Sequence, residues 1–257
     1  MEYSIEGMFG IKGQVAIVAG ATGGLGSEIS LALNALGVRL VLVGRKPESL
    51  KALEARLCSK TAEVLSVSAD ITDKSSVQGM AQAAAEKFGR IDILVNCAGM
   101  SYLETAIDFE ETMWDRLLDV NLKGTFLTCQ AVGSYMLAQK YGRIVNFSSV
   151  RGQQGRAQDL AYAPSKGAIN QLTKSLAIEW APSGINVNAI APTFTPTELN
   201  RCLLADEATR SWVLQRIPKG RLGEPEDIVG ALVFLCSPAA AFVTGHILLV
   251  DGGWTAA

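Results

Sequence analysis

Histidine and clustered cysteine are nearly missing from this sequence. Its 257 residues include one histidine, His246, and five cysteines that are widely spaced and form no C-x-x-C pair. A zinc site or a disulfide framework is therefore not indicated, and we expect the cysteines to be small core residues in a reducing compartment. A single histidine also nearly excludes a Ser-His-Asp hydrolase. No bound metal is expected.

An excess of basic charge and a long hydrophobic run are also lacking. Lysine and arginine number 23 against 25 acidic residues, so a small-molecule partner is favoured over a nucleic acid or a membrane surface. The longest apolar stretch, 229–243, is shorter than the ~20 residues that cross a bilayer and contains Pro238. Residues 1–13 show no basic segment followed by an apolar run. We expect a cytoplasmic protein.

What the sequence does contain is a regular alternation of apolar runs and helical patterns. Hydrophobic residues make up 49% of the chain, enough for a sheet covered on both faces. Strand-like runs occupy 14–20, 39–44, 63–70, 91–99, 142–149, 185–192 and 246–253. Helical spacing occurs over 28–36, 75–88, 112–139 and 166–180. The pattern predicts an α/β doubly wound Rossmann fold, with a seven-stranded, mainly parallel sheet and helices on both faces.

No linker, repeat or low-complexity tract interrupts this alternation. We therefore expect residues 1–257 to form a single Rossmann-type domain. The one irregular stretch, 193–223, holds Pro196, Pro218 and Gly220 among helix-forming residues. A helical flap that closes over substrate is one interpretation, and ordinary packing is the other.

A glycine-rich turn follows the first predicted strand. Gly20, Gly24 and Gly26 lie between that strand and the first helical pattern. Glycines at these places let the backbone approach a pyrophosphate, which then sits at the positive end of the helix dipole. The spacing alone also fits a structural turn, but its strand-turn-helix context favours a dinucleotide.

Several ordered motifs resemble the short-chain dehydrogenase/reductase family over nearly the whole chain. The turn has the spacing G-x3-G-x-G, and the family pattern Ser-x12-Tyr-x3-Lys matches Ser149, Tyr162 and Lys166. The resemblance implies a dehydrogenase or reductase acting on CH-OH groups, with these three residues and Asn121 as its catalytic residues. It also implies that Asn121 belongs to a water-mediated proton path linked to Lys166, and that Lys166 contacts the nicotinamide ribose.

The resemblance further implies cofactor-binding residues distributed along the chain. In the family's pattern an aspartate after the third strand holds the adenine, the segment after the fourth strand packs beside the cofactor, and a proline segment contacts the nicotinamide amide. These positions, with the glycine turn, are Gly20, Thr22, Gly24, Leu25, Gly26, Asp70, Ile71, Asn96, Ala98, Gly99, Tyr162, Lys166, Pro192, Thr195 and Thr197. Two positions depart from the pattern: Ala19 replaces a threonine and Thr193 replaces a glycine.

The choice between NADP(H) and NAD(H) depends on the end of the second strand. Relatives that use NAD present an acid there to the ribose 2′-hydroxyl. In this sequence the position is Gly44, and Arg45 and Lys46 follow it. Without a carboxylate to repel a 2′-phosphate, NADP(H) is favoured and Arg45 is a candidate cofactor-binding residue. If both basic residues are merely solvated, NAD(H) is possible.

Hydride transfer at a carbinol carbon requires a group that gives or takes the hydroxyl proton. If the segment from Tyr162 is helical, Lys166 lies one turn later on the same face. Lowering the pKa of a phenol from ~10 to ~7 requires about 4 kcal/mol. A positive charge ~4 Å away supplies about that much at an effective dielectric of ~20, so Lys166 is expected to lower the pKa of Tyr162. Desolvation opposes this shift. Ser149 is better suited to hydrogen-bonding the substrate oxygen than to attacking it.

The segment between Ser149 and Tyr162 carries two arginines, Arg151 and Arg156. Together these four residues are the predicted substrate-binding residues, and a bidentate guanidinium could clamp a carboxylate. The context around Arg156 resembles the gluconate 5-dehydrogenase branch, which favours a sugar acid or polyol such as gluconate or 5-ketogluconate. Surface solvation of both arginines is the alternative.

Two other functions stay open. The first is a 3-oxoacyl-thioester reductase of fatty-acid synthesis, because that branch shares much of the C-terminal sequence. The second is a non-catalytic NADP(H)-binding sensor or scaffold. The family resemblance also implies a homotetramer that uses residues 112–139, 166–180 and 243–254, although the sequence does not separate a dimer from a tetramer.

Overall fold

The computed structural model describes residues 4–57, 62–197 and 200–256. These residues form one seven-stranded sheet in the order β3-β2-β1-β4-β5-β6-β7, and each pair of neighbouring strands is parallel. The strands are β1 (Val15–Ala19), β2 (Arg39–Gly44), β3 (Val64–Ser68), β4 (Ile93–Asn96), β5 (Gly142–Phe147), β6 (Ile185–Pro192) and β7 (Ile247–Val250). The expected doubly wound sheet is confirmed, and it is wholly parallel where the sequence predicted a mainly parallel one.

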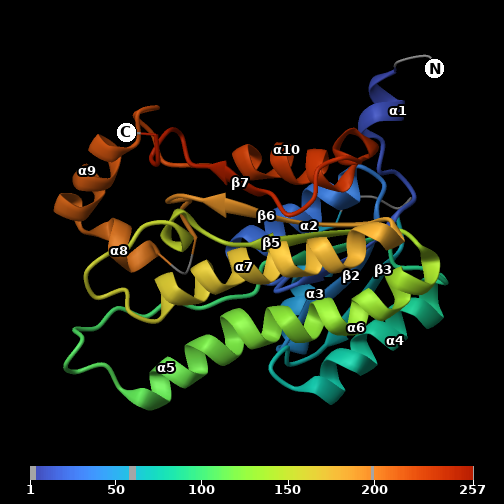
Figure 1. Cartoon of the computed structure of the whole chain (residues 1–257), viewed down its shortest axis with the longest axis horizontal. Coiled ribbons are helices and arrows are strands. Elements are labelled where there is room, and N and C mark those ends of the chain that lie inside the picture. The colour runs from blue at the N-terminus through green and yellow to red at the C-terminus, as the bar shows by residue number, and fades with distance from the viewer. Residues whose placement is uncertain (1–3, 58–61, 198–199, 257) are drawn as a thin grey trace.

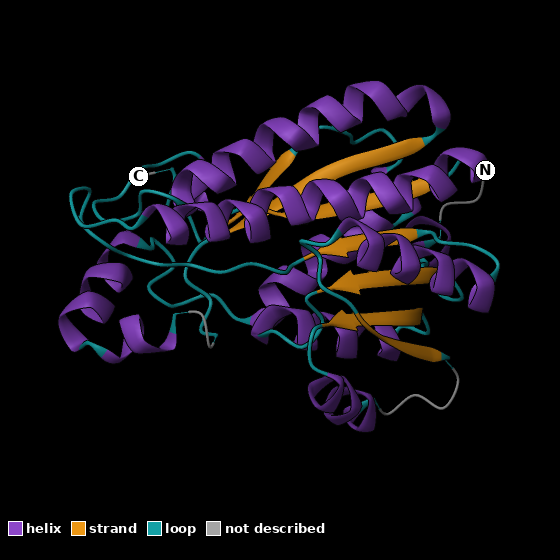
Figure 2. Cartoon of the chain, turned by 90° about the horizontal axis from the view of Figure 1, so that it is seen from below, coloured by secondary structure: helices purple, strands orange, loops and turns teal. Residues whose placement is uncertain are grey.

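Helices cover both faces of this sheet (Figures 1 and 2). The helices are α1 (Ile5–Phe9), α2 (Gly24–Ala35), α3 (Pro47–Arg56), α4 (Lys74–Phe88), α5 (Glu111–Leu118), α6 (Gly124–Gln139), α7 (Tyr162–Trp180), α8 (Arg201–Ala205), α9 (Glu207–Arg216) and α10 (Pro225–Cys236). Because successive strand residues point to opposite faces, Val15 and Ile17 join a core with α4, α6 and α7, whereas Ala16 and Val18 join a second core with α2, α3 and α10. Both cores are built from alternating strand positions that the sequence shows as continuous apolar runs.

Three predicted helices differ from the structure in their boundaries by several residues. The helix expected over 28–36 begins four residues earlier, at Gly24 of α2. The helix expected over 112–139 is divided into α5 and α6 by a π-helical turn, Asp119–Lys123. The helix expected over 166–180 begins four residues earlier, at Tyr162, where Pro164 fits the first turn because it needs no amide partner. Single π-turns inside α-helices occur frequently at functional sites. This one contains Asn121.

The segment 193–223 connects β6 to α10 and contains the short helices α8 and α9. These helices lie beyond the carboxyl end of the sheet, at the left of Figure 1. A small separate core joins them to the rest of the molecule through Val150, Val213, Ile217 and Trp254. The segment is helical as expected, and its closure over substrate stays a prediction.

The cysteines are only partly the core residues that we expected. Cys129 and Cys236 are buried and Cys97 is partly buried, but Cys202 is exposed. The prediction is wrong for Cys202 because α8 is a short surface helix that buries none of its residues. Cys58 lies outside the described residues. Within the described part of the chain, no helix combines the length and the apolar character needed to cross a bilayer.

Candidate active site

The predicted site residues gather where the parallel strands end. Gly20 follows β1, Ala98 follows β4 and Ser149 follows β5. The chain leaves β1 and β4 toward opposite edges of the sheet, and open α/β sheets bind ligands at such a reversal of strand order. Figure 2 shows the arrowheads of the strands directed toward the loops on the side of the C-terminus. The site therefore lies at the carboxyl edge, beside the flap segment 193–223.

The glycine turn after β1 leaves room only for backbone. Gly20 has φ +85°, and a Cβ atom there would lie 2.5 Å from the Ala98 amide nitrogen. A Cβ atom on Gly26 would collide with the Gly20 carbonyl oxygen. The N-cap of α2 is Gly23, which supplies no side chain to cap the first amides of the helix. Those amides and the helix dipole suit a pyrophosphate, so the turn fits a dinucleotide.

A cavity of about 220 Å³ adjoins this turn. It is lined by Gly20, Thr22, Gly23, Val43, Gly44, Arg45, Ala69, Asp70, Ile71, Cys97, Ala98, Gly99 and Val120. The Asp70 carboxylate accepts hydrogen bonds from the amide and the hydroxyl of Thr72, which lower its pKa. The cavity thus brings together most of the residues predicted to hold the adenine and its ribose, with Arg45 beside the bare Gly44.

The start of the flap segment covers the glycine turn. A Cβ atom on Gly24 would lie 2.7 Å from the Cβ atom of Thr197. Asn200 holds this part of the chain in place, because its amide donates to the Thr195 carbonyl at 2.8 Å and accepts from the Thr197 amide at 2.9 Å. Thr197 therefore lies against the turn, whereas Thr195 lies beside Gly223, and their contact with a cofactor stays a prediction.

Nine of the sixteen predicted cofactor residues do not line the 220 Å³ cavity: Gly24, Leu25, Gly26, Asn96, Tyr162, Lys166, Pro192, Thr195 and Thr197. The buried Asn96 side chain donates to Asn146 at 3.0 Å and accepts from Thr128 at 2.8 Å, so it braces the interior. Leu25 packs against the core on the α2 side of the sheet. Pro192 is the last residue of β6.

The structure brings Tyr162, Lys166 and Ser149 together at the start of α7. The Lys166 ammonium lies 5.5 Å from the centre of the Tyr162 ring and donates to the Phe147 carbonyl at 2.6 Å. Burial of Lys166, which is 5% exposed, lowers its pKa to about 8. The Ser149 hydroxyl accepts from the Arg151 amide at 3.1 Å and is also a hydrogen-bond partner of the Tyr162 phenol.

The direction of the Tyr162 pKa differs from the sequence-based argument. That argument expects Lys166 to lower the pKa of the phenol, but burial raises it above its ordinary value. The hydrogen bond from Ser149 opposes the rise, while the charge of Asp159 adds to it. The expectation is wrong for the protein by itself, because desolvation of the phenolate outweighs the neighbouring charges.

Asn121 connects the loop after β4 to α7. Its side chain accepts from the Met100 amide at 2.8 Å and donates to the Met100 carbonyl at 3.0 Å and to the Ser165 hydroxyl at 3.1 Å. Ser165 in turn donates to the Tyr162 carbonyl at 2.7 Å. Asn121 is fully buried and its amide is engaged by protein groups, so its side chain positions the loop against the helix that carries Tyr162.

A cavity of about 500 Å³ lies next to the Tyr162 phenol. Its lining residues are Ser101, Tyr102, Leu103, Ser149, Val150, Arg151, Arg156, Asp159, Tyr162, Thr193, Phe194, Asn200, Cys202 and Leu203. All four predicted substrate residues are among them. Sequence reasoning missed Asp159, whose signal was an acidic residue three positions before Tyr162 in the segment with the two arginines.

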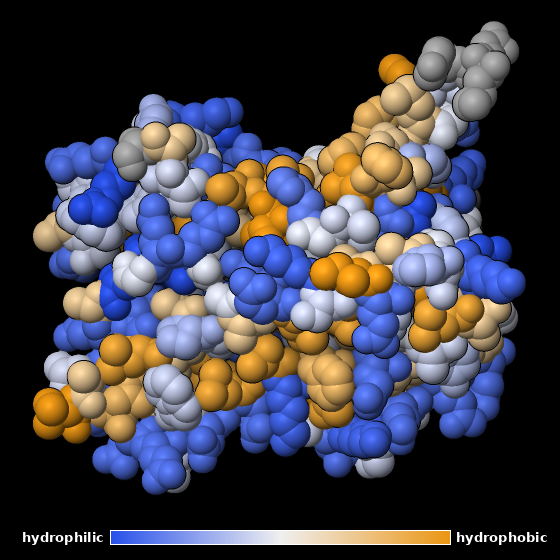
Figure 3. Space-filling view, viewed as in Figure 1, coloured by the Kyte–Doolittle hydropathy of each residue, from blue (hydrophilic) through white to orange (hydrophobic). Residues whose placement is uncertain are grey.

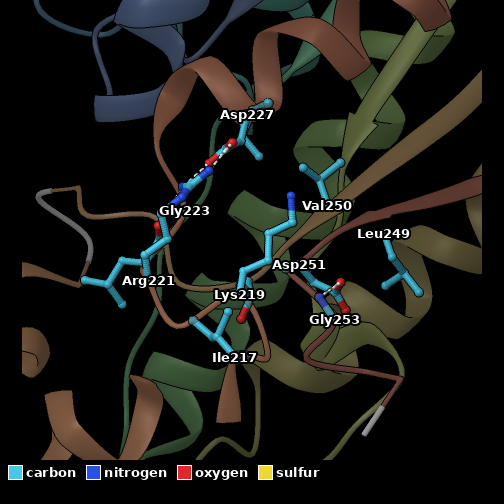
Figure 4. Close-up of a pocket in the computed structure, with 13 residues that line it drawn as sticks. Ile217, Lys219, Arg221, Gly223, Asp227, Leu249, Val250, Asp251 and Gly253 are labelled. Atoms are coloured by element: carbon cyan, nitrogen blue, oxygen red, sulfur yellow. Dashed lines mark hydrogen bonds and ion pairs between the residues drawn. The ribbon is translucent and has the colours of Figure 1, made fainter. Parts of the chain in front are cut away.

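A second hollow of about 340 Å³ shares Thr193 with this cavity. Figure 4 shows the Arg221–Asp227 ion pair at its upper end and the Lys219 side chain between Asp227 and Asp251. Arg221 and Asp227 approach to 2.7 Å, and the Lys219 amide donates to the Gly252 carbonyl at 3.1 Å. These contacts hold the base of the flap segment against α10 and the turn after β7.

Comparison with known proteins agrees with this geometry. The family profile described as enoyl-(acyl carrier protein) reductase matches residues 20–255. The chain belongs to the short-chain dehydrogenase/reductase family. Like other members, this short-chain dehydrogenase/reductase is an oxidoreductase acting on CH-OH groups, and its relatives act on sugar alcohols and sugar acids.

Three relatives illustrate the similarity of this short-chain dehydrogenase/reductase to sugar and polyol enzymes. D-threitol dehydrogenase of Mycolicibacterium smegmatis is 41% identical over 99% of this chain and 97% of its own. An NAD-dependent glycerol dehydrogenase of Listeria innocua is 38% identical over 96% of each chain. The crystal structure of a gluconate 5-dehydrogenase from Burkholderia cenocepacia in complex with NADP and tartrate matches with a TM-score of 0.95 at 35% identity, over 99% of this chain and 100% of that one. The predicted likeness to the gluconate 5-dehydrogenase branch is confirmed.

Proposed function

We propose that this chain is an NADP(H)-dependent dehydrogenase that interconverts an alcohol and a ketone on a sugar acid or polyol, such as gluconate and 5-ketogluconate. The observation that carries the proposal is the 500 Å³ cavity in which Tyr162 and Ser149 face the same space as two guanidinium groups. Beside it, the glycine turn and the smaller cavity fit a dinucleotide.

Each residue of the site has a separate role in the proposed reaction. The dinucleotide, when bound, supplies or accepts the hydride. The Tyr162 phenol gives the proton to the substrate oxygen during reduction and takes it back during oxidation. Ser149 would hydrogen-bond that oxygen. The Lys166 ammonium, which donates to the Phe147 carbonyl, would contact the nicotinamide ribose. Because the Tyr162 pKa is raised, the phenol holds its proton at neutral pH and is ready to donate it in reduction. In oxidation it must first lose that proton, since only the phenolate can accept one from the alcohol.

NADP(H) is the proposed cofactor because the end of β2 offers no carboxylate. Gly44 and Arg45 both line the 220 Å³ cavity, where an acidic residue would repel a 2′-phosphate. The related gluconate 5-dehydrogenase binds NADP, whereas the glycerol dehydrogenase is NAD-dependent. NAD(H) is therefore the alternative that the experiment below includes.

The charge of the substrate cavity supports a sugar acid over an acyl thioester. Arg151 and Arg156 supply two positive charges and Asp159 one negative charge, so the wall attracts an anion. Three ionised side chains are a poor lining for the alkyl chain of a 3-oxoacyl thioester. The presence of both Tyr162 and Lys166 speaks against a sensor without catalysis.

The test is oxidation of gluconate, D-threitol and galactitol with NADP⁺ and with NAD⁺, measured by the absorbance of the reduced nicotinamide. We expect turnover by the wild type and a loss of about 10²–10⁴-fold in Tyr162→Phe, with NADPH affinity largely unchanged. Near-normal activity of Tyr162→Phe would overturn the mechanism. A tenfold or greater preference for NAD⁺ would overturn the cofactor assignment. No turnover of any substrate despite tight NADPH binding would favour a sensor.

A further inference from the structure

Asp159 is a buried carboxylate in the substrate cavity for which the proposed chemistry has no use. Its side chain is 1% exposed, and it lines the same cavity as Ser149 and Tyr162. Among the described residues, neither of its oxygens meets a hydrogen-bond donor in good geometry. The Ala163 amide favours its charge slightly, but burial dominates and raises the Asp159 pKa. A carboxylate in such surroundings is costly to keep unless a ligand uses it.

Two other aspartates that are buried in the described part of the chain show what a structural role looks like in this protein. Asp92 accepts from the Val15 amide at 2.9 Å and from the Arg90 guanidinium at 2.6 Å. Asp251 accepts from the Thr255 hydroxyl at 2.6 Å and from the Gly253 amide at 3.0 Å. Both carboxylates are satisfied by groups that they hold in place. Asp159 holds nothing comparable.

Guanidinium nitrogens of Arg151 and Arg156 that lack an acceptor in the described part of the chain lie in the same cavity wall as the Asp159 carboxylate. The Arg156 Nη2 atom is 3.5 Å from Asp159 Oδ2, which makes an ion pair but no hydrogen bond. Within the described residues, the buried Arg156 Nε and Arg151 Nη2 atoms also find no acceptor. One wall therefore presents acceptors and donors side by side. A hydroxyl group matches such a wall because it both donates and accepts.

The backbone before Asp159 is strained. Gln158 has φ +66°, in the left-handed region that favours glycine. The turn is held by hydrogen bonds from the Asp159 amide to the Arg156 carbonyl at 3.2 Å and from the Glu104 amide to the Gln158 carbonyl at 3.0 Å. Strain at a non-glycine residue persists only where the surroundings impose it, and it is typical of ligand-binding segments. Here it accompanies the burial of Asp159 in the cavity wall.

We propose that Asp159 is a specificity-determining residue that accepts hydrogen bonds from substrate hydroxyl groups next to the reacting carbon. The free donors of Arg151 and Arg156 bind oxygens of the same chain. Arg156 retains 20% exposure of its side chain, so its guanidinium can turn toward the substrate and uncover the carboxylate. The substrate class is a polyhydroxylated chain, whether a sugar alcohol or a sugar acid. This inference rests on the proposed function and specifies how the enzyme recognises its substrate.

The inference predicts that the wild type discriminates against chains without neighbouring hydroxyls. A site built to bind a hydroxyl rejects the analogue that lacks it, because its buried polar groups then stay without partners. D-threitol and butan-2-ol test this directly, since both are four-carbon chains oxidised at a secondary alcohol. Gluconate adds a hydroxylated chain with a carboxylate. Oxidation is followed for wild type, Asp159→Asn and the surface control Glu63→Gln, which breaks an exposed ion pair with Lys87.

We expect Asp159→Asn to lower kcat/KM for D-threitol and gluconate about 10- to 100-fold, the effect of losing a charged hydrogen bond. Its kcat/KM for butan-2-ol should stay within about threefold of the wild type, and Glu63→Gln should change nothing. Any effect of Asp159 on the Tyr162 phenol changes kcat/KM for all three alcohols alike, so it cancels when kcat/KM for one alcohol is divided by that for another. Thermal unfolding and NADPH titration verify that each variant is folded. If Asp159→Asn does not fold, Arg156→Gln should show the same selective loss.

The possible failures are distinguishable. Equal losses on D-threitol and butan-2-ol would show that Asp159 is structural and would overturn this inference alone. Equal kcat/KM of the wild type for D-threitol and butan-2-ol would also overturn this inference alone. A wild type that oxidises none of the three alcohols would overturn the proposed function together with the inference. The kcat/KM for gluconate divided by that for D-threitol should change little in Asp159→Asn, which supports hydroxyl recognition. If Asp159 instead lay next to the substrate carboxylate, removing its negative charge would raise this ratio.

Discussion

Lys166 carries a positive charge at a place where the fold disfavours one. It is 5% exposed, and burial lowers its pKa from 10.5 to about 8. Below pH 8 the lysine is protonated in both the folded and the unfolded chain, so the cost of burying the ammonium is present in full. Between pH 8 and 10.5 only the unfolded chain keeps the proton, and stability therefore rises with pH. Lys166 is retained against this cost because its charge serves the site.

We therefore expect Lys166→Met to abolish turnover and yet to stabilise the protein at neutral pH. The rise in Tm should be roughly 2–6 °C, because relief of about 1–2 kcal/mol shifts a domain of this size by that amount. The advantage should shrink as the pH is raised through the range in which the wild-type lysine loses its proton. Calorimetry at about pH 7 and about pH 10 measures both effects. A variant less stable than the wild type at neutral pH would contradict the assignment.

At the residue scale, the sequence was enough to predict Tyr162 as the proton donor but not the direction in which its pKa shifts. The joint spacing of Ser149, Tyr162 and Lys166 predicted that they meet, and they do. The rise in the Tyr162 pKa could not be predicted, because the extent of burial depends on elements far away in the chain. Asp159 was missed for the same reason: nothing in the sequence shows that an acidic loop residue is buried without donors.

Trp254 connects the C-terminal segment, the flap and the wall of the substrate cavity. Its ring lies 5.6 Å from Phe194, 5.7 Å from Trp212 of α9 and 5.5 Å from the Arg151 guanidinium. Its indole nitrogen donates to Gln154 at 2.8 Å. One buried side chain thus touches three segments whose relative placement shapes the cavity.

The prediction for this element is a change in substrate binding with chemistry retained. Trp254→Ala should raise KM for the accepted sugar acid or polyol about 3- to 10-fold, because the stacking that orients Arg151 is lost. Its kcat should fall far less, since Tyr162 and Lys166 are on α7. Trp254→Phe keeps the ring and should lie near the wild type. Phe242→Ala, which truncates a fully exposed ring, is the control. An unchanged KM in Trp254→Ala would refute the connection.

Elements were predicted unevenly. Each of the seven strands is a compact apolar run, so the sequence revealed its existence and its approximate limits. The π-turn at Asp119–Lys123 was not predictable, because one wider turn hardly alters the spacing of apolar residues along a helix of that length. The region 193–223 was recognised as irregular, but its docking through Trp254 joins residues far apart in the chain.

On the scale of the whole molecule, the helical face formed by α5, α6 and α7 has apolar side chains that the chain does not cover. Figure 3 shows hydrophobic surface along this side of the molecule. Exposed large side chains there include Trp114 of α5, Phe126 and Leu137 of α6, and Ile178 of α7, the last with 80% exposure. Contiguous apolar surface on a folded chain commonly marks an interface between subunits.

We expect the wild type to elute as a homotetramer and the double variant Phe126→Glu with Ile178→Glu to elute as dimers or monomers. Charge placed in an apolar contact has to be desolvated, which destabilises association. Size-exclusion chromatography with light scattering measures the mass. Ile107→Glu, at another highly exposed residue, should remain tetrameric. A monomeric wild type would exclude this use of the face.

The position of the substrate wall has a consequence for how such enzymes diversify. Ser149 is held by the end of β5 and Tyr162 by the start of α7, whereas Arg151, Arg156 and Asp159 occupy the excursion between these two anchors. Replacing the segment between Ser149 and Tyr162 would alter which substrate binds and would leave the catalytic side chains in place. A lineage can therefore explore new substrates one loop at a time, and loop exchange between relatives is a practical route to redesigned selectivity.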